Sequence, residues 1–214
     1  MSTLARTTDV FADGELVLVG DERDRTLFLV CAADDIDAAR LERLHQLGRG
    51  MVVLGLAEKI ARRLAIPAPW DSAGGSHDLG LTVPIDAAAG IAGGWSSRER
   101  ARTMQVASDP SSGPSDVTHP GHVYTGLIDE RPGNAAAAAI ELARLSARAP
   151  AVALSAVIDR HGSSVSLRDA RTDDQLSRRH RLRQARRVGA VRVRTQPRDR
   201  PGPRRRSSAD RRRQ

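Results

Sequence analysis

Arg131 stands shortly before the stretch Ala135–Ala147, where five consecutive alanines predict a helix. An arginine just ahead of a helix N-terminus suits an anion, because the free backbone N–H groups and the guanidinium both attract negative charge. The alternative is a solvated arginine in a loop. The position of Arg131 therefore predicts a phosphate contact.

Other residue types exclude more chemistry than they support. Cys31 is the only cysteine, so the chain forms no intramolecular disulfide and no cysteine-cage zinc site. Five of the six histidines show no metal-ligand spacing, and we expect them at the surface: His45, His77, His119, His161 and His180. Trp95, Met104 and Leu127 are expected to pack in the core or in loops.

Short apolar runs alternate with helical patterns, which predicts an α/β body over residues 10–170. Aromatic residues make up only 2% of the chain, so the core must be aliphatic. Pro110, Pro114 and Pro120 predict a long loop over 109–121. Strands are expected at 15–19, 26–32, 51–56, 81–85 and 151–158. Helices are expected from Asp35 as cap to Leu47, over 57–65, from Ser96 or Ser97 to Met104, and over 135–147.

Charge divides the chain into two parts. Residues 178–214 hold 16 arginines and two acidic residues, a formal charge of +14, whereas residues 1–177 carry −6. We therefore expect a disordered N-terminus at 1–9, one domain at 10–177 and an Arg-rich tail at 178–214.

The Arg-rich tail has three interpretations. The chain contains 33 arginines and one lysine, as a GC-rich gene encodes, so a frame-shifted or decayed end ranks first. A solvated, disordered basic tail ranks second. Nucleic-acid binding ranks third and would be non-specific, because arginines attract phosphates but no aromatic residue offers a stacking platform.

No apolar run is long enough to span a bilayer, and the N-terminus lacks the apolar region of a secretory signal. We therefore expect a soluble, cytoplasmic protein that makes no membrane contact.

Three ordered stretches carry a family resemblance. Residues 90–104 read GIAGGWSSRERARTM, residues 114–122 read PSDVTHPGH, and residues 82–87 read TVPIDA. In motif, order and spacing they resemble the 3,4-dihydroxy-2-butanone 4-phosphate synthases, from about residue 14 to about 170. The resemblance implies a single α+β-type domain whose mixed sheet is flanked by helices.

The resemblance also implies a reaction. Such enzymes are Mg²⁺-dependent carbon–carbon lyases that convert ribulose 5-phosphate to formate and the four-carbon precursor of riboflavin. They are usually homodimers with composite sites. A divalent ion stabilises the enediolate, and positioned acids and bases move the protons. His122 matches the catalytic histidine of the family loop, although a loop imidazole that caps backbone groups is an equal alternative.

Several positions depart from the family pattern. By ungapped alignment of the acidic loop, Arg23 keeps its place and Asp24 falls where the metal-binding glutamate stands. Both could be remnants of the sugar site or an exposed charged turn. Thr26 replaces a later glutamate, and Phe28 replaces the catalytic aspartate.

Two further departures fall later in the chain. Asn134 replaces the histidine that is the second metal ligand, and Ala156 replaces the later catalytic glutamate. Asp24 and Asn134 therefore remain as weak candidate Mg²⁺ ligands. Phe28 and Ala156 cannot take a proton, and loss of one acid or base costs about 10²–10⁴ in rate. The sequence thus predicts a family member whose own activity is weak or absent, with a non-catalytic sugar-phosphate binder or partner subunit as the alternative.

Overall fold

The computed structural model describes residues 3–21, 26–67, 79–131, 134–166, 169 and 190–193. Its helices are α1 (Thr3–Ala12), α2 (Ala38–Gly48), α3 (Glu58–Arg63), α4 (Ser97–Ser108), the 3₁₀ helix η1 (Pro114–Asp116) and α5 (Ala135–Leu145). Its strands are β1 (Val17–Asp21), β2 (Thr26–Ala32), β3 (Arg49–Leu56), β4 (Leu79–Leu81), β5 (Ile85–Ala87), β6 (Val117–Val123), β7 (Thr125–Ile128), β8 (Ala151–Val157) and β9 (Ala190–Val193).

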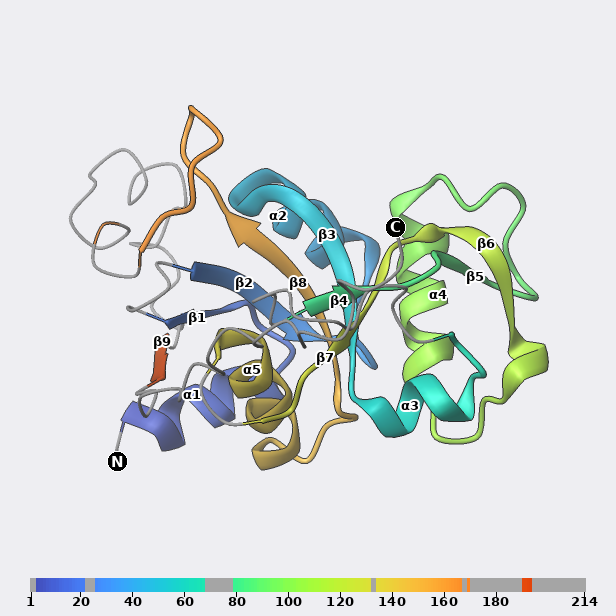
Figure 1. The fold of residues 1–214 in the computed structure, drawn as a ribbon, viewed down its shortest axis with the longest axis horizontal. Helices are drawn as coiled ribbons and strands as arrows, with labels where there is room; N and C mark the ends of the chain where they lie inside the picture. The colour runs from blue at the N-terminus through green and yellow to red at the C-terminus, as the bar shows by residue number, and fades with distance from the viewer. Residues whose placement is uncertain are drawn as a thin grey trace, which may run out of the picture.

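A seven-stranded mixed sheet in the order β4-β7-β3-β8-β2-β1-β9 forms the centre of the molecule (Figure 1). The β3–β7 and β1–β9 pairs are parallel, and the other four pairs are antiparallel. The expectation of a mixed sheet flanked by helices is thereby confirmed.

Alternation along the strands builds two aliphatic cores. In β2, Leu27 and Leu29 face one cluster, whereas Val30 and Ala32 face the other, as the two-residue period of a strand requires. Buried residues of α2, α3 and α4 complete the first cluster, and those of α1 and α5 complete the second. Figure 1 shows α1 and α5 together on one side of the sheet.

A small region projects beyond the main sheet and consists of α4, η1 and the two-stranded sheet β5–β6 (Figure 1). The expected loop over 109–121 is wrong here, because β6 begins at Val117. Pro120 is tolerated in β6 because this strand has a single partner, β5, and its missing N–H interrupts no second ladder. Gly121 is needed because a Cβ there would lie 2.1 Å from the Ile85 carbonyl carbon.

The N-terminus differs from the sequence prediction. Instead of a disordered segment at 1–9, the chain forms α1 from Thr3. Thr7, Val10 and Phe11 are buried, and Ser146 Oγ donates to the Thr8 carbonyl at 3.1 Å. Tertiary packing on α5 therefore stabilises a helix that threonine-rich local sequence does not favour.

The N-cap of helix α2 lies two residues later than expected. Asp37, rather than Asp35, is the N-cap, and its side chain accepts from the Arg40 N–H at 2.7 Å. Asp35 instead forms an ion pair with Arg148 at 2.9 Å.

The expectation of a disordered tail over 178–214 is also partly corrected. Its residues Ala190–Val193 form β9, which pairs in parallel with β1, so these four residues are not disordered. The rest of 178–214 lies outside the described residues.

Candidate functional site

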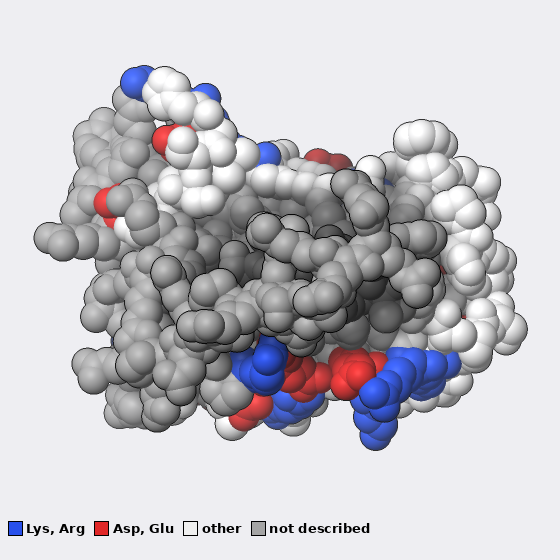
Figure 2. Space-filling model, viewed as in Figure 1, with Lys and Arg blue, Asp and Glu red and all other residues white. Residues whose placement is uncertain are grey.

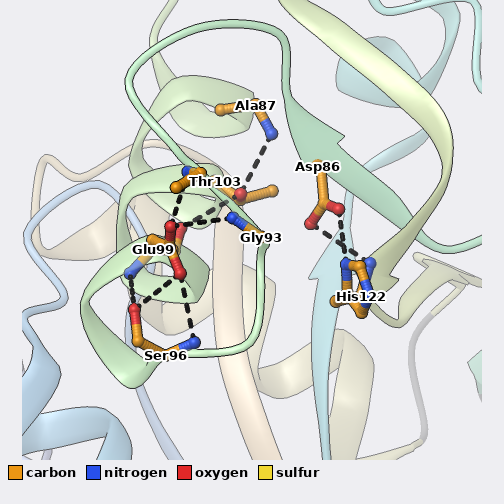
Figure 3. A network of polar contacts seen from close by, with 8 residues as sticks. Asp86, Ala87, Gly93, Ser96, Glu99, Thr103 and His122 are labelled. Atoms are coloured by element: carbon orange, nitrogen blue, oxygen red, sulfur yellow. Dashed lines mark hydrogen bonds and ion pairs between the residues drawn. The ribbon is translucent and has the colours of Figure 1, made fainter.

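His122 lies on β6 and is held by Asp86 on the neighbouring strand β5 (Figure 3). One carboxylate oxygen of Asp86 lies 2.7 Å from His122 Nδ1, and the other accepts from the backbone N–H of His122 at 3.1 Å. The Asp86 side chain is 10% exposed and that of His122 is 33% exposed. The carboxylate therefore fixes both the backbone and the ring of His122 while the ring still reaches solvent.

The loop before α4 covers this pair and is organised by Glu99. The Glu99 carboxylate accepts from the backbone N–H groups of Ala92 at 2.6 Å, Gly93 at 3.2 Å and Ser96 at 3.3 Å (Figure 3). Ser96 Oγ in turn accepts from the Glu99 N–H, which completes a capping box. These bonds, first of all that from Ala92, lower the pKa of Glu99 to about 2.

Thr103 joins α4 to β5, since its Oγ1 accepts from the Ala87 N–H at 3.0 Å and donates to the Glu99 carbonyl at 3.1 Å. Trp95 lies in the loop before α4, one of the two expected settings; it is 79% exposed, and its ring lies 4.3 Å from that of His122. Met104 is fully buried, as expected. The region around His122 is therefore a connected set of hydrogen bonds and ring contacts.

His45 is only half-buried rather than a free surface residue. Its Nε2 lies 2.9 Å from an Arg100 side-chain nitrogen. Burial, and next the Arg100 charge, lower the pKa of His45. Burial also lowers the pKa of Arg100. His119 and His161 are exposed, as expected, whereas His77 and His180 lie outside the described residues.

The replaced proton carriers meet on the main sheet. Phe28 on β2 is the direct partner of Ala156 on β8, so the two side chains share one face. Phe28 packs against the cluster that contains the buried alanines of α5. Thr26, at the start of β2, pairs with Asp21. Neither Phe28 nor Ala156 has a group that can bind or release a proton, whereas the family resemblance implies carboxylates at both positions.

Asn134 has a structural role at the same face. Its Oδ1 accepts from the Ala137 N–H at 2.5 Å as the N-cap of α5, and its Nδ2 donates to the Asp129 carbonyl at 3.2 Å. The residue is fully buried. Both polar atoms of the side chain are thus engaged within the protein, and Asn134 presents no oxygen to an ion.

Arg131 lies at the surface near this helix start. Its guanidinium forms hydrogen bonds with both carboxylate oxygens of Asp129, at 2.9 and 2.8 Å from Nε. These bonds raise the pKa of Arg131. The side chain is 87% exposed, so it can still meet an anion from solvent.

The donor set in the described part of the chain does not fit Mg²⁺. Asn134 is consumed as a cap, and no group of three or more His, Cys, Asp or Glu side chains with metal-binding geometry occurs among the described residues. Arg23 and Asp24 lie outside the described residues. Mg²⁺ prefers several oxygen ligands in strict octahedral geometry, which the described residues do not supply.

Sequence reasoning missed Asp86, Glu99 and Gly94. Asp86 is the only acidic residue in the TVPIDA stretch, so the signal was present but had no partner until β5 and β6 were paired. Gly94 has φ +73°, and a Cβ there would lie 2.4 Å from His122 Nδ1. Such a close approach is visible only in three dimensions.

The whole chain was compared with protein families, with curated proteins and with solved structures. A family model described as 3,4-dihydroxy-2-butanone 4-phosphate synthase matches residues 5–186. The chain belongs to this family. The 3,4-dihydroxy-2-butanone 4-phosphate synthase of Chromobacterium violaceum is 34% identical over 162 residues, which cover 72% of this chain and 77% of the relative. That of Mannheimia succiniciproducens is 33% identical over 150 residues, which cover 67% and 70%.

The fold agrees with a solved 3,4-dihydroxy-2-butanone 4-phosphate synthase in complex with two magnesium ions. The TM-score is 0.73 at 20% identity, and the match covers 90% of this chain and 93% of that one. Another relative, from Synechocystis, is named as a riboflavin biosynthesis protein. The sequence-based recognition of the synthase family is therefore confirmed.

The described surface carries ion pairs, which bears on the expectation that the chain makes no membrane contact. Figure 2 shows acidic and basic side chains next to each other along its lower edge. Arg62 pairs with Glu58, and Arg144 pairs with Glu130. Among the described helices, none is both long and apolar enough to cross a bilayer.

Proposed function

We propose that this synthase-family chain converts ribulose 5-phosphate to formate and 3,4-dihydroxy-2-butanone 4-phosphate only weakly or not at all. The observation that carries the proposal is the Phe28–Ala156 pair, which places two side chains without ionisable groups side by side on the sheet. The family pattern has proton carriers at both positions. Each lost acid or base costs about 10²–10⁴ in rate, and the two losses occur on one face.

Mg²⁺, where the family uses it, polarises the substrate carbonyl. The described residues of this chain do not form such a site, so we assign no step to the ion here. Sugar-phosphate binding remains part of the proposal, because the Arg131 guanidinium is exposed near the start of α5. Arginine suits a phosphate through its forked donors.

A second candidate function is that of a partner subunit. The His122–Asp86 pair is intact and lies in the small region of α4, η1, β5 and β6, which projects beyond the main sheet (Figure 1). Family sites are composite, so a homodimer, or a mixed dimer with an active homologue, would bring His122 of one copy to the sheet face of the other. In a mixed dimer this chain would contribute His122 and lack the carboxylates.

The family reaction is tested by formate release. Purified protein is incubated with ribulose 5-phosphate and Mg²⁺, with the Chromobacterium violaceum synthase as positive control. We expect a rate at least about 10²-fold below the control. A rate equal to that of the control would overturn the proposal.

The partner function is tested by complementation. The control synthase is first inactivated by replacing the histidine of its own P-G-H loop, and is then mixed with this chain or with its His122→Gln variant. Recovery of formate release with the unaltered chain, but not with His122→Gln, supports a mixed site. No recovery with either chain rejects the partner function.

A further inference from the structure

The contacts of Asp86 define which nitrogen of His122 can exchange a proton. An ionised carboxylate only accepts hydrogen bonds, so the 2.7 Å contact requires Nδ1 to carry the hydrogen. In the neutral ring the lone pair then resides on Nε2, which makes no hydrogen bond among the described residues. The exposed part of the ring is thus available to accept a proton.

We infer that Asp86 is a positioning residue that holds His122 in the Nδ1–H tautomer and aims Nε2 outward for proton transfer. This inference rests on the role of His122 in the proposed function. Asp86 reaches no substrate itself, because its side chain is almost fully buried against β6 and the loop before α4. Its two oxygens hold the ring and the backbone of the same residue, so rotation of the ring away from Asp86 sacrifices one of two coupled bonds.

Gly94 encloses the same contact from the other side. An added Cβ would lie 2.4 Å from His122 Nδ1 and 2.8 Å from the Asp86 carboxylate. The backbone of the loop therefore occupies the space that water would need to compete for Nδ1. Trp95, next in the chain, lies against the imidazole at a ring distance of 4.3 Å and an angle of 54°.

Glu99 keeps this loop in place. Its carboxylate binds the backbone N–H groups of Ala92 and Gly93 on one side of Gly94, and that of Ser96 beyond Trp95. Glu99 thus fixes the loop, the loop encloses the Asp86–His122 contact, and this contact determines which ring nitrogen carries the hydrogen. Three parts of the sequence, 86–87, 92–99 and 122, thus determine the state of one imidazole.

The test reads the tautomer directly and needs no turnover. In the full chain with ¹⁵N-labelled histidine, the His122 signals are assigned by their loss in His122→Gln. At a pH where the ring is neutral, we expect the Nδ1–H tautomer in the unaltered protein. Asp86→Asn should shift the population towards Nε2–H, because an amide can donate as well as accept and so does not select one tautomer. Asp116→Asn, an exposed carboxylate of the same region, is the control and should leave the tautomer unchanged.

A second pair of variants covers the case in which Asp86→Asn does not fold. Gly94→Ala should displace the Asp86–His122 contact and change the tautomer. Gly162 has a similar positive φ, +79° against +73° at Gly94, but a Cβ there would meet nothing within 4 Å, so Gly162→Ala adds backbone strain without the clash. It should leave the His122 signals unchanged. An Nδ1–H tautomer that persists in Asp86→Asn or in folded Gly94→Ala would overturn the inference.

Formate release separates this inference from the proposed function. Where the unaltered chain, or its mixture with an inactivated synthase, releases formate, Asp86→Asn should lower kcat by about 10²-fold with little change in KM. Asp86→Glu should restore part of that loss. Where neither the unaltered chain nor its mixture with an inactivated synthase releases formate, the partner function is rejected, but the tautomer measurement still confirms or rejects the positioning role.

Discussion

The region around His122 and the Phe28–Ala156 face differ in what holds them together. The first is polar, and each of its side chains has a specific partner: Asp86 with His122, Glu99 with the loop backbone, and Thr103 with β5. The second is apolar, and Phe28 packs on a cluster of aliphatic and alanine side chains.

This difference bears on the proposed loss of proton carriers from the Phe28–Ala156 face. A sheet face tolerates apolar replacements as long as volume is kept, because packing is non-directional. A hydrogen-bonded cluster tolerates less, since removing one member leaves a buried partner unsatisfied. Under the proposed function, proton carriers on the sheet were therefore replaceable, whereas the polar groups around His122 are tied to the structure.

The largest expected effects come from core truncation, which tests whether the two regions unfold as one. Met104 under the His122 region and Ile140 on α5 are both fully buried. Met104→Ala and Ile140→Ala should each lower the free energy of unfolding by about 2–5 kcal/mol. Urea unfolding followed by far-UV circular dichroism and by tryptophan fluorescence should give coincident curves.

Exposed Glu141, also on α5, provides the control, since Glu141→Ala should change stability by no more than about 0.5 kcal/mol. A fluorescence midpoint that shifts alone in Met104→Ala would mean that the two regions unfold separately.

Loss of the α5 cap should have a smaller effect. Asn134→Ala removes the acceptor for the Ala137 N–H and should cost about 1–2 kcal/mol, at the upper end for a buried cap. Thermal unfolding should show a drop of about 2–4 °C for each kcal/mol, both with and without Mg²⁺. Asn134→Ser keeps a capping oxygen and should lose less. A Mg²⁺-dependent stabilisation that disappears in Asn134→Ala would instead make Asn134 a ligand.

Acid should destabilise the His122 region by protonating Glu99. This loss of stability should be smaller than that in Asn134→Ala, because the Glu99 carboxylate lies near solvent. Its pKa in the folded chain, about 2, is below the ordinary value of 4.5. The stabilisation is therefore complete above pH 4.5 and is lost as the pH falls towards 2. Urea midpoints measured across this window should fall less steeply in Glu99→Gln than in the unaltered protein. Equal slopes would remove Glu99 as the organiser of the loop.

The smallest expected effect on stability is that of Arg131→Ala, because an ion pair of a fully exposed arginine contributes little to stability. Its effect on ligand binding should be larger. Titration calorimetry with ribulose 5-phosphate should show weaker binding in Arg131→Ala than in Arg62→Ala, a second exposed arginine that pairs with a carboxylate. Equal affinities would remove Arg131 from the phosphate site.

The sequence predicted most of the main sheet and, in the small region, helix α4 but not strand β6. Strand β2 was predicted with its observed ends, because Thr26–Ala32 is a continuous apolar run between polar residues. Strand β6 was missed, since two histidines, a proline and a glycine hide its pattern. Strand β7 was missed because it is short.

For the site residues too, local patterns were predictable and contacts between distant residues were not. The sequence did not predict the pairing of Phe28 with Ala156, because these residues lie far apart in the chain and only the register between β2 and β8 makes them partners. The place of Asn134 before the alanines is enough to predict that it caps the helix. Its burial could not be predicted from the sequence. The role of Asp86 depends on a contact between residues 36 positions apart.

Strand β9 affects how the chain can be shortened. Its parallel pairing with β1 covers backbone groups that would otherwise lie at the open side of the sheet. A version that ends before Ala190 leaves β1 as an edge with free N–H and C=O groups, and such edges recruit strands from other molecules. The arginine-rich segment thus contributes the four residues that cover this side of β1.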